Sequence, residues 1–230
     1  MRPAKHFQSC RVATEDQCSC EIRGYSYLAS LTLAVSLLEF GVAQYLAKSS
    51  SVKVDAMHAG IHSSWYGLAV TVSWLVSRFD FAKNNEARLR AFFGCANFLL
   101  LLFSLGMVVW FDAWPKWQTN SPVGPYMMLV GGLIGLSGNW LQLGVLKKIK
   151  VILLQQKGKL HETFEWSKTD VLADLWLSLA VSSAAFYLIA SRLAGFGIWF
   201  RVDPLLTFIA AAWIAYIAFD LFIRKTAKNI

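Results

Sequence analysis

Two pairs of ionisable side chains stand at helical spacing inside long apolar stretches of the sequence. His58 and His62 are four residues apart, and Asp170 and Asp174 are four residues apart as well. On a helix, residues at i and i+4 project from one face with Cβ atoms about 6 Å apart, so each pair can hold one ion between its side chains. A charged group inside a bilayer costs about 2.5–3.5 kcal/mol, which favours a functional role for such residues.

The two pairs are expected to lie at similar depths in the membrane, so that their side chains can meet. Counted from the start of each stretch, the histidines lie roughly 10–17 Å from one surface and the aspartates roughly 12–18 Å from the other. Both positions fall near the middle of a hydrocarbon core about 30 Å thick. An isolated intramembrane His or Asp often only hydrogen-bonds a neighbouring helix, but two pairs matched in spacing and depth favour a metal site. Two imidazoles and two carboxylates suit tetrahedral zinc and also accept other divalent first-row ions.

The charge balance of this predicted site indicates exchange of metal for protons. Two carboxylates beside neutral histidines carry a double negative charge, which a divalent cation neutralises in the low-dielectric interior. When the ion leaves, protons can replace it, and imidazole, whose unperturbed pKa is about 6.5, is suited to that exchange near physiological pH. The pattern therefore predicts a metal–proton antiporter.

The elements that position these residues follow from the composition. Of 230 residues, 56% are hydrophobic and only 16% are charged, and the mean hydropathy is +0.46. Soluble domains carry about 25% charged residues, so the apolar surplus must face lipid. The net charge of +8 comes from basic residues scattered between apolar stretches, which argues against a nucleic-acid-binding surface. We therefore expect an all-α membrane protein.

Six stretches are long enough for a helix to cross the bilayer, which takes roughly 20 residues. Polar segments rich in Lys, Arg, Pro, Gly or Asn separate them. Residues 1–24 are expected to form a cytoplasmic tail, and residues 25–230 a six-helix cation efflux domain. The predicted spans are Tyr25–Ala47, Ser51–Ser77, Arg88–Ala113, Pro125–Lys147, Glu162–Arg192 and Asp203–Ile223.

The distribution of basic residues predicts the orientation of this bundle. If the N-terminus is cytoplasmic, few of the 22 Lys and Arg residues fall in outer loops. The positive-inside rule then makes both termini cytoplasmic. The first twenty or so residues lack the apolar region of a signal peptide, which, with the compact size, suggests a bacterial inner (plasma) membrane. The outer basic residues are Lys48, Lys53, Lys116, Arg192 and Arg201, and the aromatic residues near the outer boundary are Trp110, Trp114, Trp117 and Trp199.

Two further acidic residues are weaker candidates for an ion pathway. Asp55 lies one turn outward of His58 and either guides ions toward the exit or stabilises the helix N-terminus. Glu39, in the middle of the first span, either lines the pathway or hydrogen-bonds a neighbouring helix. A small-residue face in the fourth span is expected to let helices approach closely. It comprises Gly131, Gly135 and Gly138.

These residues resemble the cation diffusion facilitator family of metal transporters. The segment VDAMHAGIHS is similar to the family's Asp-Ala-x-His-x-x-x-Asp signature, in which Asp55 and His58 match and His62 occupies the usual Asp position. The segment TDVLADLWLS resembles the family's His-x-x-x-Asp element, with Asp170 where His is common and Asp174 matching. Looser similarities are Glu39-x-Gly41, Gly138-Asn139 and Asp203-Pro204.

The resemblance implies a six-helix bundle that exports a divalent cation from the cytoplasm in exchange for protons. The ion would lie between the second and fifth helices, bound by a His/His pair and an Asp/Asp pair. Zinc is the expected ion, with cobalt, iron, manganese and cadmium as alternatives. Most family members continue into a cytoplasmic metal-sensing and dimerising domain, which is expected to be lacking here, so that a homodimer would form through the membrane helices.

Two other classes of protein use similar residues. Integral membrane hydroxylases and desaturases bind a catalytic metal through His-x-x-x-His, but they need several histidine clusters and this chain has 4 histidines. The second class is a structural partner subunit that does not transport ions. The presence of four residues that can bind a metal argues against this class. We expect no enzymatic activity, no catalytic residue and no resident cofactor. The expected partners are the metal ion, protons and the lipid bilayer.

Overall fold

The regular secondary structure of the described residues is helical throughout. The computed structural model describes residues 19–157 and 162–228, and no strand occurs within these ranges. The prediction of an all-α protein is therefore confirmed. The elements are α1 (Ser19–Gly41), a π-helical turn η2 (Val42–Ala47), α2 (Ser50–Arg78), α3 (Asp80–Asn84), α4 (Glu86–Val108), a second π-helical turn η3 (Val109–Ala113), α5 (Trp114–Thr119), α6 (Pro125–Lys157), α7 (Glu162–Leu193) and α8 (Val202–Lys228).

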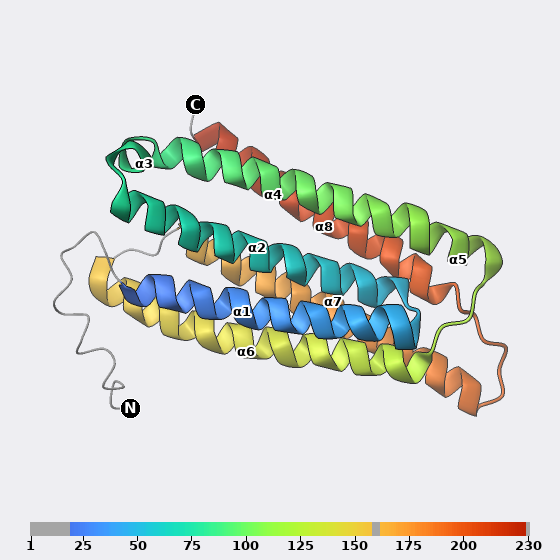
Figure 1. Ribbon diagram of the computed structural model, residues 1–230. Coiled ribbons are helices and arrows are strands. Elements are labelled where there is room, and N and C mark those ends of the chain that lie inside the picture. Colours follow the sequence, from blue (N-terminus) through green and yellow to red (C-terminus); the bar gives the residue numbers. More distant parts are fainter. Residues whose placement is uncertain (1–18, 158–161, 229–230) are drawn as a thin grey trace, which may run out of the picture.

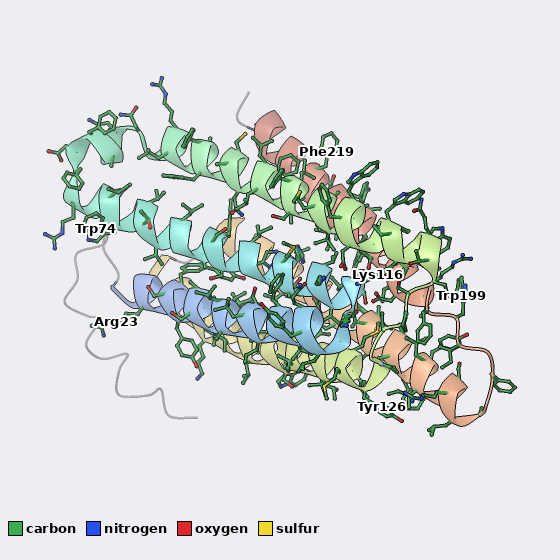
Figure 2. The ribbon with its side chains drawn as sticks, turned by 45° about the vertical axis from the view of Figure 1, so that its right-hand side comes forward. Arg23, Trp74, Lys116, Tyr126, Trp199 and Phe219 are labelled. Carbon is green, nitrogen blue, oxygen red and sulfur yellow. The ribbon has the colours of Figure 1, made fainter. Side chains whose placement is uncertain are left out.

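Five helical segments of the described chain are long and apolar enough to cross a membrane. They begin in α1, α4, α6, α7 and α8, and they make this a multi-pass integral membrane protein. Large apolar side chains such as Trp74 and Phe219 project outward from the bundle, as lipid-facing residues do (Figure 2). The five segments are Arg23–Ala47, Ala91–Thr119, Pro125–Lys150, Ser167–Leu193 and Val202–Asp220.

The remaining long helix, α2, has 29 residues but is not among these apolar segments. Its His, Asp and Ser residues lower its hydropathy, so only five of the six predicted spans meet the apolar criterion. α2 contacts α1, α4, α6, α7 and α8. Figure 1 shows it between the group formed by α1, α6 and α7 and the pair formed by α4 and α8. A helix surrounded by protein can carry polar residues that a lipid-facing helix cannot.

The long helices run side by side, so the bundle has two ends (Figure 1). We call the end at which α1 begins and α8 ends the proximal end, and the opposite end, at which α2 and α8 begin, the distal end. Arg23 and Trp74 lie toward the proximal end, and Lys116 and Trp199 toward the distal end (Figure 2). The sequence predicts that the proximal end faces the cytoplasm.

The polar segment after Ala113 does not form the loop that the sequence suggests. The chain continues as helix through η3 and α5, and Pro115 occupies the first turn of α5. The π-helical turn η3, whose last hydrogen bond runs from the Trp114 N–H to the Val109 carbonyl, interrupts the regular i→i−4 pattern directly before Pro115, which has no N–H to donate. Within α5, the Trp117 ring packs against Trp199 at 6.4 Å between centroids, and the Arg201 guanidinium lies 5.6 Å from the Trp117 ring centre.

The start of α2 is fixed by a carboxylate from α8. Asp203, fully buried, accepts hydrogen bonds from the backbone N–H groups of Ser50 at 2.8 Å and Ser51 at 3.1 Å. The hydroxyls of Ser49 and Ser51 each donate to the same carboxylate at 2.6 Å. The first N–H groups of a helix have no partner within the helix, and a negative charge at this end is favourable. Asp203 therefore joins α8 to α2 at the distal end.

Candidate metal centre

Three of the four predicted ligands meet between α2 and α7. His58 and His62 lie one turn apart on α2, and Asp174 faces both of them from α7. The Asp174 Oδ1 atom pairs with His58 Nδ1, and Oδ2 lies 3.1 Å from His62 Nδ1. One donor atom from each residue lies within 4.8 Å of the others. The structure thus brings together three of the four side chains that the sequence proposed as ligands.

The triad is almost completely removed from solvent. His58 and His62 are each 4% exposed, and Asp174 is 0% exposed. The two imidazole rings lie 4.2 Å apart between centroids and are inclined by 63°. Apart from the two imidazoles, no described group hydrogen-bonds with the Asp174 oxygens. A set of two imidazole nitrogens and one carboxylate is a donor set that zinc and other divalent first-row ions accept.

The fourth predicted ligand, Asp170, belongs to α7 and precedes Asp174 by one helical turn. Its side chain lies outside the side chains that the structure describes. Its role as a ligand therefore stays a prediction from the sequence.

A hydrogen-bonded chain runs beside the triad from α6 to α7 and α2. Gln142 of α6 donates from Nε2 to Asn139 Oδ1 at 3.1 Å, and Asn139 donates from Nδ2 to Ser178 Oγ at 3.3 Å. Ser178 in turn donates to Asp55 Oδ2 at 2.7 Å. Asp55, a weaker candidate in the sequence analysis, lies near the start of α2 and accepts a hydrogen bond from Ser178 of α7. Ser178 was not identified from the sequence, although its position four residues after Asp174 was a usable signal.

The glycine face predicted on α6 lies against α1 and α2. A Cβ atom built on Gly131 would lie 2.7 Å from Val52 Cγ1, and one on Gly138 would lie 2.6 Å from Val35 Cγ2. Contacts this short are incompatible with any side chain at these positions, so the prediction of close helix packing is confirmed. Gly135 lies between them and approaches Glu39 of α1 in the same way.

The proximal side of the triad is apolar. Tyr66 lies one turn beyond His62 on α2, is 1% exposed, and packs in a cluster that joins α1, α2, α6 and α7. The Tyr25 and Tyr66 rings lie 6.2 Å apart between centroids. Asp55 and Ser178 therefore lie toward the distal end from the triad, and the cluster that contains Tyr66 lies toward the proximal end. The buried members of the cluster are Tyr25, Leu28, Tyr66, Leu146, Ile149 and Val171.

No family model matches this chain, and no curated protein matches it. The resemblance to the cation diffusion facilitator family therefore rests on the residues quoted from the sequence.

Proposed function

We propose that this protein is a secondary active transporter that exports a divalent metal cation, with zinc as the first choice, from the cytoplasm in exchange for protons. The ion substrate binds His58, His62 and Asp174, and Asp170 completes the shell as the fourth ligand. The single observation that carries the proposal is the convergence of this triad in a buried position between two helices. α2 then crosses the membrane as a sixth span, protected from lipid by its neighbours.

Competition between protons and metal at the triad is the chemical basis of the proposal. Both imidazoles direct Nδ1 at the Asp174 carboxylate, so the atoms that would bind a metal are the atoms that share protons in its absence. A histidine must be neutral to bind a metal, and metal binding therefore releases protons. Entry of protons promotes metal release, and entry of metal promotes proton release, which is the elementary requirement of an antiporter.

The surroundings of the triad favour vectorial movement over simple binding. The cluster around Tyr25 and Tyr66 is mostly aliphatic and aromatic, whereas Asp55 and Ser178 place polar groups toward the distal end. In this proposal an ion leaves the triad toward the distal end, and its entry from the proximal end requires separation of the cluster around Tyr25 and Tyr66. Exposure of a buried site to one side at a time is the basis of alternating access.

A flux assay in vesicles tests the proposal. The purified protein is reconstituted, a pH gradient is imposed, and uptake of zinc, cobalt, manganese, cadmium and ferrous ions is followed. We expect gradient-driven flux in the wild type and in Asp80→Asn, which changes an exposed carboxylate far from the triad. We expect no flux with Asp174→Asn. Metal binding without flux in the wild type would contradict the proposal and favour a non-transporting partner subunit.

A metal-dependent membrane enzyme is the second candidate function. The described part of the site offers three protein ligands, His58, His62 and Asp174. Catalytic zinc sites also use three protein ligands and leave the fourth position to water or a substrate. The burial of the triad below 5% exposure argues for a site that an ion reaches and a larger substrate does not. If Asp170 is the fourth ligand, no coordination position remains for water or a substrate. Loss of metal affinity in Asp170→Asn would therefore argue against an enzyme, which needs such an open position.

A further inference from the structure

Two buried carboxylates outside the triad lie side by side on α1 and α2. Glu39 is 1% exposed and Asp55 is 2% exposed. Neither forms an ion pair with Lys or Arg in the described part of the chain. The Glu39 Oε1 atom is buried and has no hydrogen-bond partner among the described residues. A buried carboxylate without a compensating charge is costly, so each carboxyl of this pair is either protonated or compensated by a cation.

The oxygens of this pair converge on one point of α6. A Cβ atom built on Gly135 would collide with Glu39 Oε1, would lie 2.5 Å from Ser178 Oγ, and would lie 3.1 Å from Asp55 Oδ2. Three oxygen atoms from α1, α2 and α7 therefore surround the position that any other residue at 135 would occupy. Glycine is the residue that leaves those oxygens together.

The hydrogen bonds around the pair point in one direction. Gln142 donates to Asn139, Asn139 to Ser178, and Ser178 to Asp55. The chain ends on Asp55 Oδ2, which accepts the hydrogen bond from Ser178. No donor among the described residues reaches Glu39 Oε1. The Ser178 oxygen and the two carboxylates thus offer acceptor atoms to a positive charge.

We propose that Glu39, Asp55 and Ser178 form a second cation site, made of oxygen ligands only, which takes a hard divalent cation such as Mn²⁺ or Mg²⁺. Carboxylate and hydroxyl oxygens suit such cations, whereas the imidazoles of the first site suit zinc. Asp55 precedes His58 on α2, and Ser178 follows Asp174 on α7, so the second site lies about one helical turn, roughly 5 Å, to the distal side. This inference deepens the proposed function, and for its role in transport it rests on that function, because an ion that leaves the triad meets this site next.

Manganese binding to the purified full-length protein tests the inference. Mn²⁺ is used alone, its stoichiometry is measured by equilibrium dialysis, and its ligands are examined by electron spin echo spectroscopy, which detects coupling to histidine nitrogen. We expect two ions in the wild type, one of them coupled to nitrogen. Glu39→Gln, which keeps the side-chain shape, removes the uncoupled ion. Asp174→Asn removes the coupled ion and retains the other.

Further variants separate loss of the site from loss of the fold. Gly135→Ala fills the point where the oxygens meet and is expected to remove the uncoupled ion, whereas Gly144→Ala, on the same helix with open space around it, retains both ions. Melting temperatures of all variants are compared in parallel. A wild type that binds one nitrogen-coupled ion, with stoichiometry unchanged by Glu39→Gln, would overturn the inference.

The result is also independent of the transport assay. Two bound ions without gradient-driven zinc flux would contradict the proposed function and support the second site. Flux with a single bound ion would support the function and overturn the second site.

Discussion

The imidazole of His62 and the carboxylate of Asp174 join α2 to α7 at 3.1 Å, between atoms Nδ1 and Oδ2. The two residues are separated by more than a hundred positions in the sequence, and the contact exists because α2 and α7 run in opposite directions past each other. Together with His58, they place nitrogen and oxygen donors within one buried site. Three predictions concern this site and its surroundings, one concerns the distal end, and one the orientation in the membrane.

Removal of the Asp174 carboxylate is expected to abolish tight metal binding. Asp174→Asn keeps the size of the side chain but removes the negative charge that faces both imidazoles. We expect the affinity for Zn²⁺ to fall at least about 100-fold, because loss of even an outer-shell partner costs 10–100-fold. Isothermal titration calorimetry measures the change. Asp80→Asn is the matched control, and equal losses in both variants would contradict the prediction.

Zinc affinity is expected to fall as the pH is lowered. Each histidine must lose its proton before it binds metal, so acid shifts the competition toward the protonated site, and alkaline conditions shift it toward the metal-bound site. The dependence of log Kd on pH is measured by titration at several pH values. His62→Gln, which removes one titrating ligand, is expected to give a shallower slope. An unchanged slope would show that His62 does not exchange its proton for metal.

A methyl group at position 135 is expected to impair transport more than one at position 144. In Gly135→Ala the added atom meets Glu39, Ser178 and Asp55, whereas in Gly144→Ala it meets nothing within 4 Å. The first variant must displace buried polar side chains and lose metal flux, and the second should match the wild type. Vesicle flux and melting temperature are measured for both. Equal flux in the two variants would show that the close approach of α6 to these oxygens has no role in transport.

Loss of the Asp203 carboxylate is expected to destabilise the bundle at its distal end. Asp203→Ala leaves the N–H groups of Ser50 and Ser51 and two serine hydroxyls without their acceptor. We expect the free energy of unfolding to fall by about 3 kcal/mol or more, because several buried hydrogen bonds to a charged group are lost together. Ser49→Ala, which removes one donor, should cost about 1 kcal/mol. Denaturation in detergent compares the two, and a smaller loss for Asp203→Ala would be inconsistent with this arrangement.

The orientation is expected to place the distal end outside the cytoplasm. Gln118 in α5 and Asn84 in α3 are exposed at opposite ends of the bundle. In a chain whose native cysteines are replaced, a membrane-impermeant maleimide added to intact cells should modify Gln118→Cys. It should modify Asn84→Cys only after permeabilisation. The reverse pattern would place the proximal end outside and reverse the direction of transport.

Much of the helical framework was predictable from the sequence, because apolar length and helix-boundary residues are local properties. The second span was predicted as Ser51–Ser77 and is the helix Ser50–Arg78, preceded by the capping residue Ser49. The sixth was predicted to begin at Asp203, one residue after its start. The helix through Pro115 was missed, since proline and the polar residues around it were interpreted as a loop.

The partners of the buried polar residues were not predictable in the same way. The i,i+4 spacing places His58 and His62 on one face, but the identity of the facing helix depends on how all the helices pack. Asp55 was left with two alternative roles, and only the packing of α7 shows that it accepts a hydrogen bond from Ser178. The contact between Asp203 and the first turn of α2 likewise joins residues that are 152 to 154 positions apart.

Attachment of α2 to α8 at one end has a mechanical consequence. A rod held at one point moves little near its anchor and most at its free end. At 1.5 Å per residue, His62 lies about 18 Å from the anchored first turn and Arg78 about 42 Å from it. Any tilt of α2 about this anchor therefore displaces its proximal tip more than twice as far as it displaces the imidazoles.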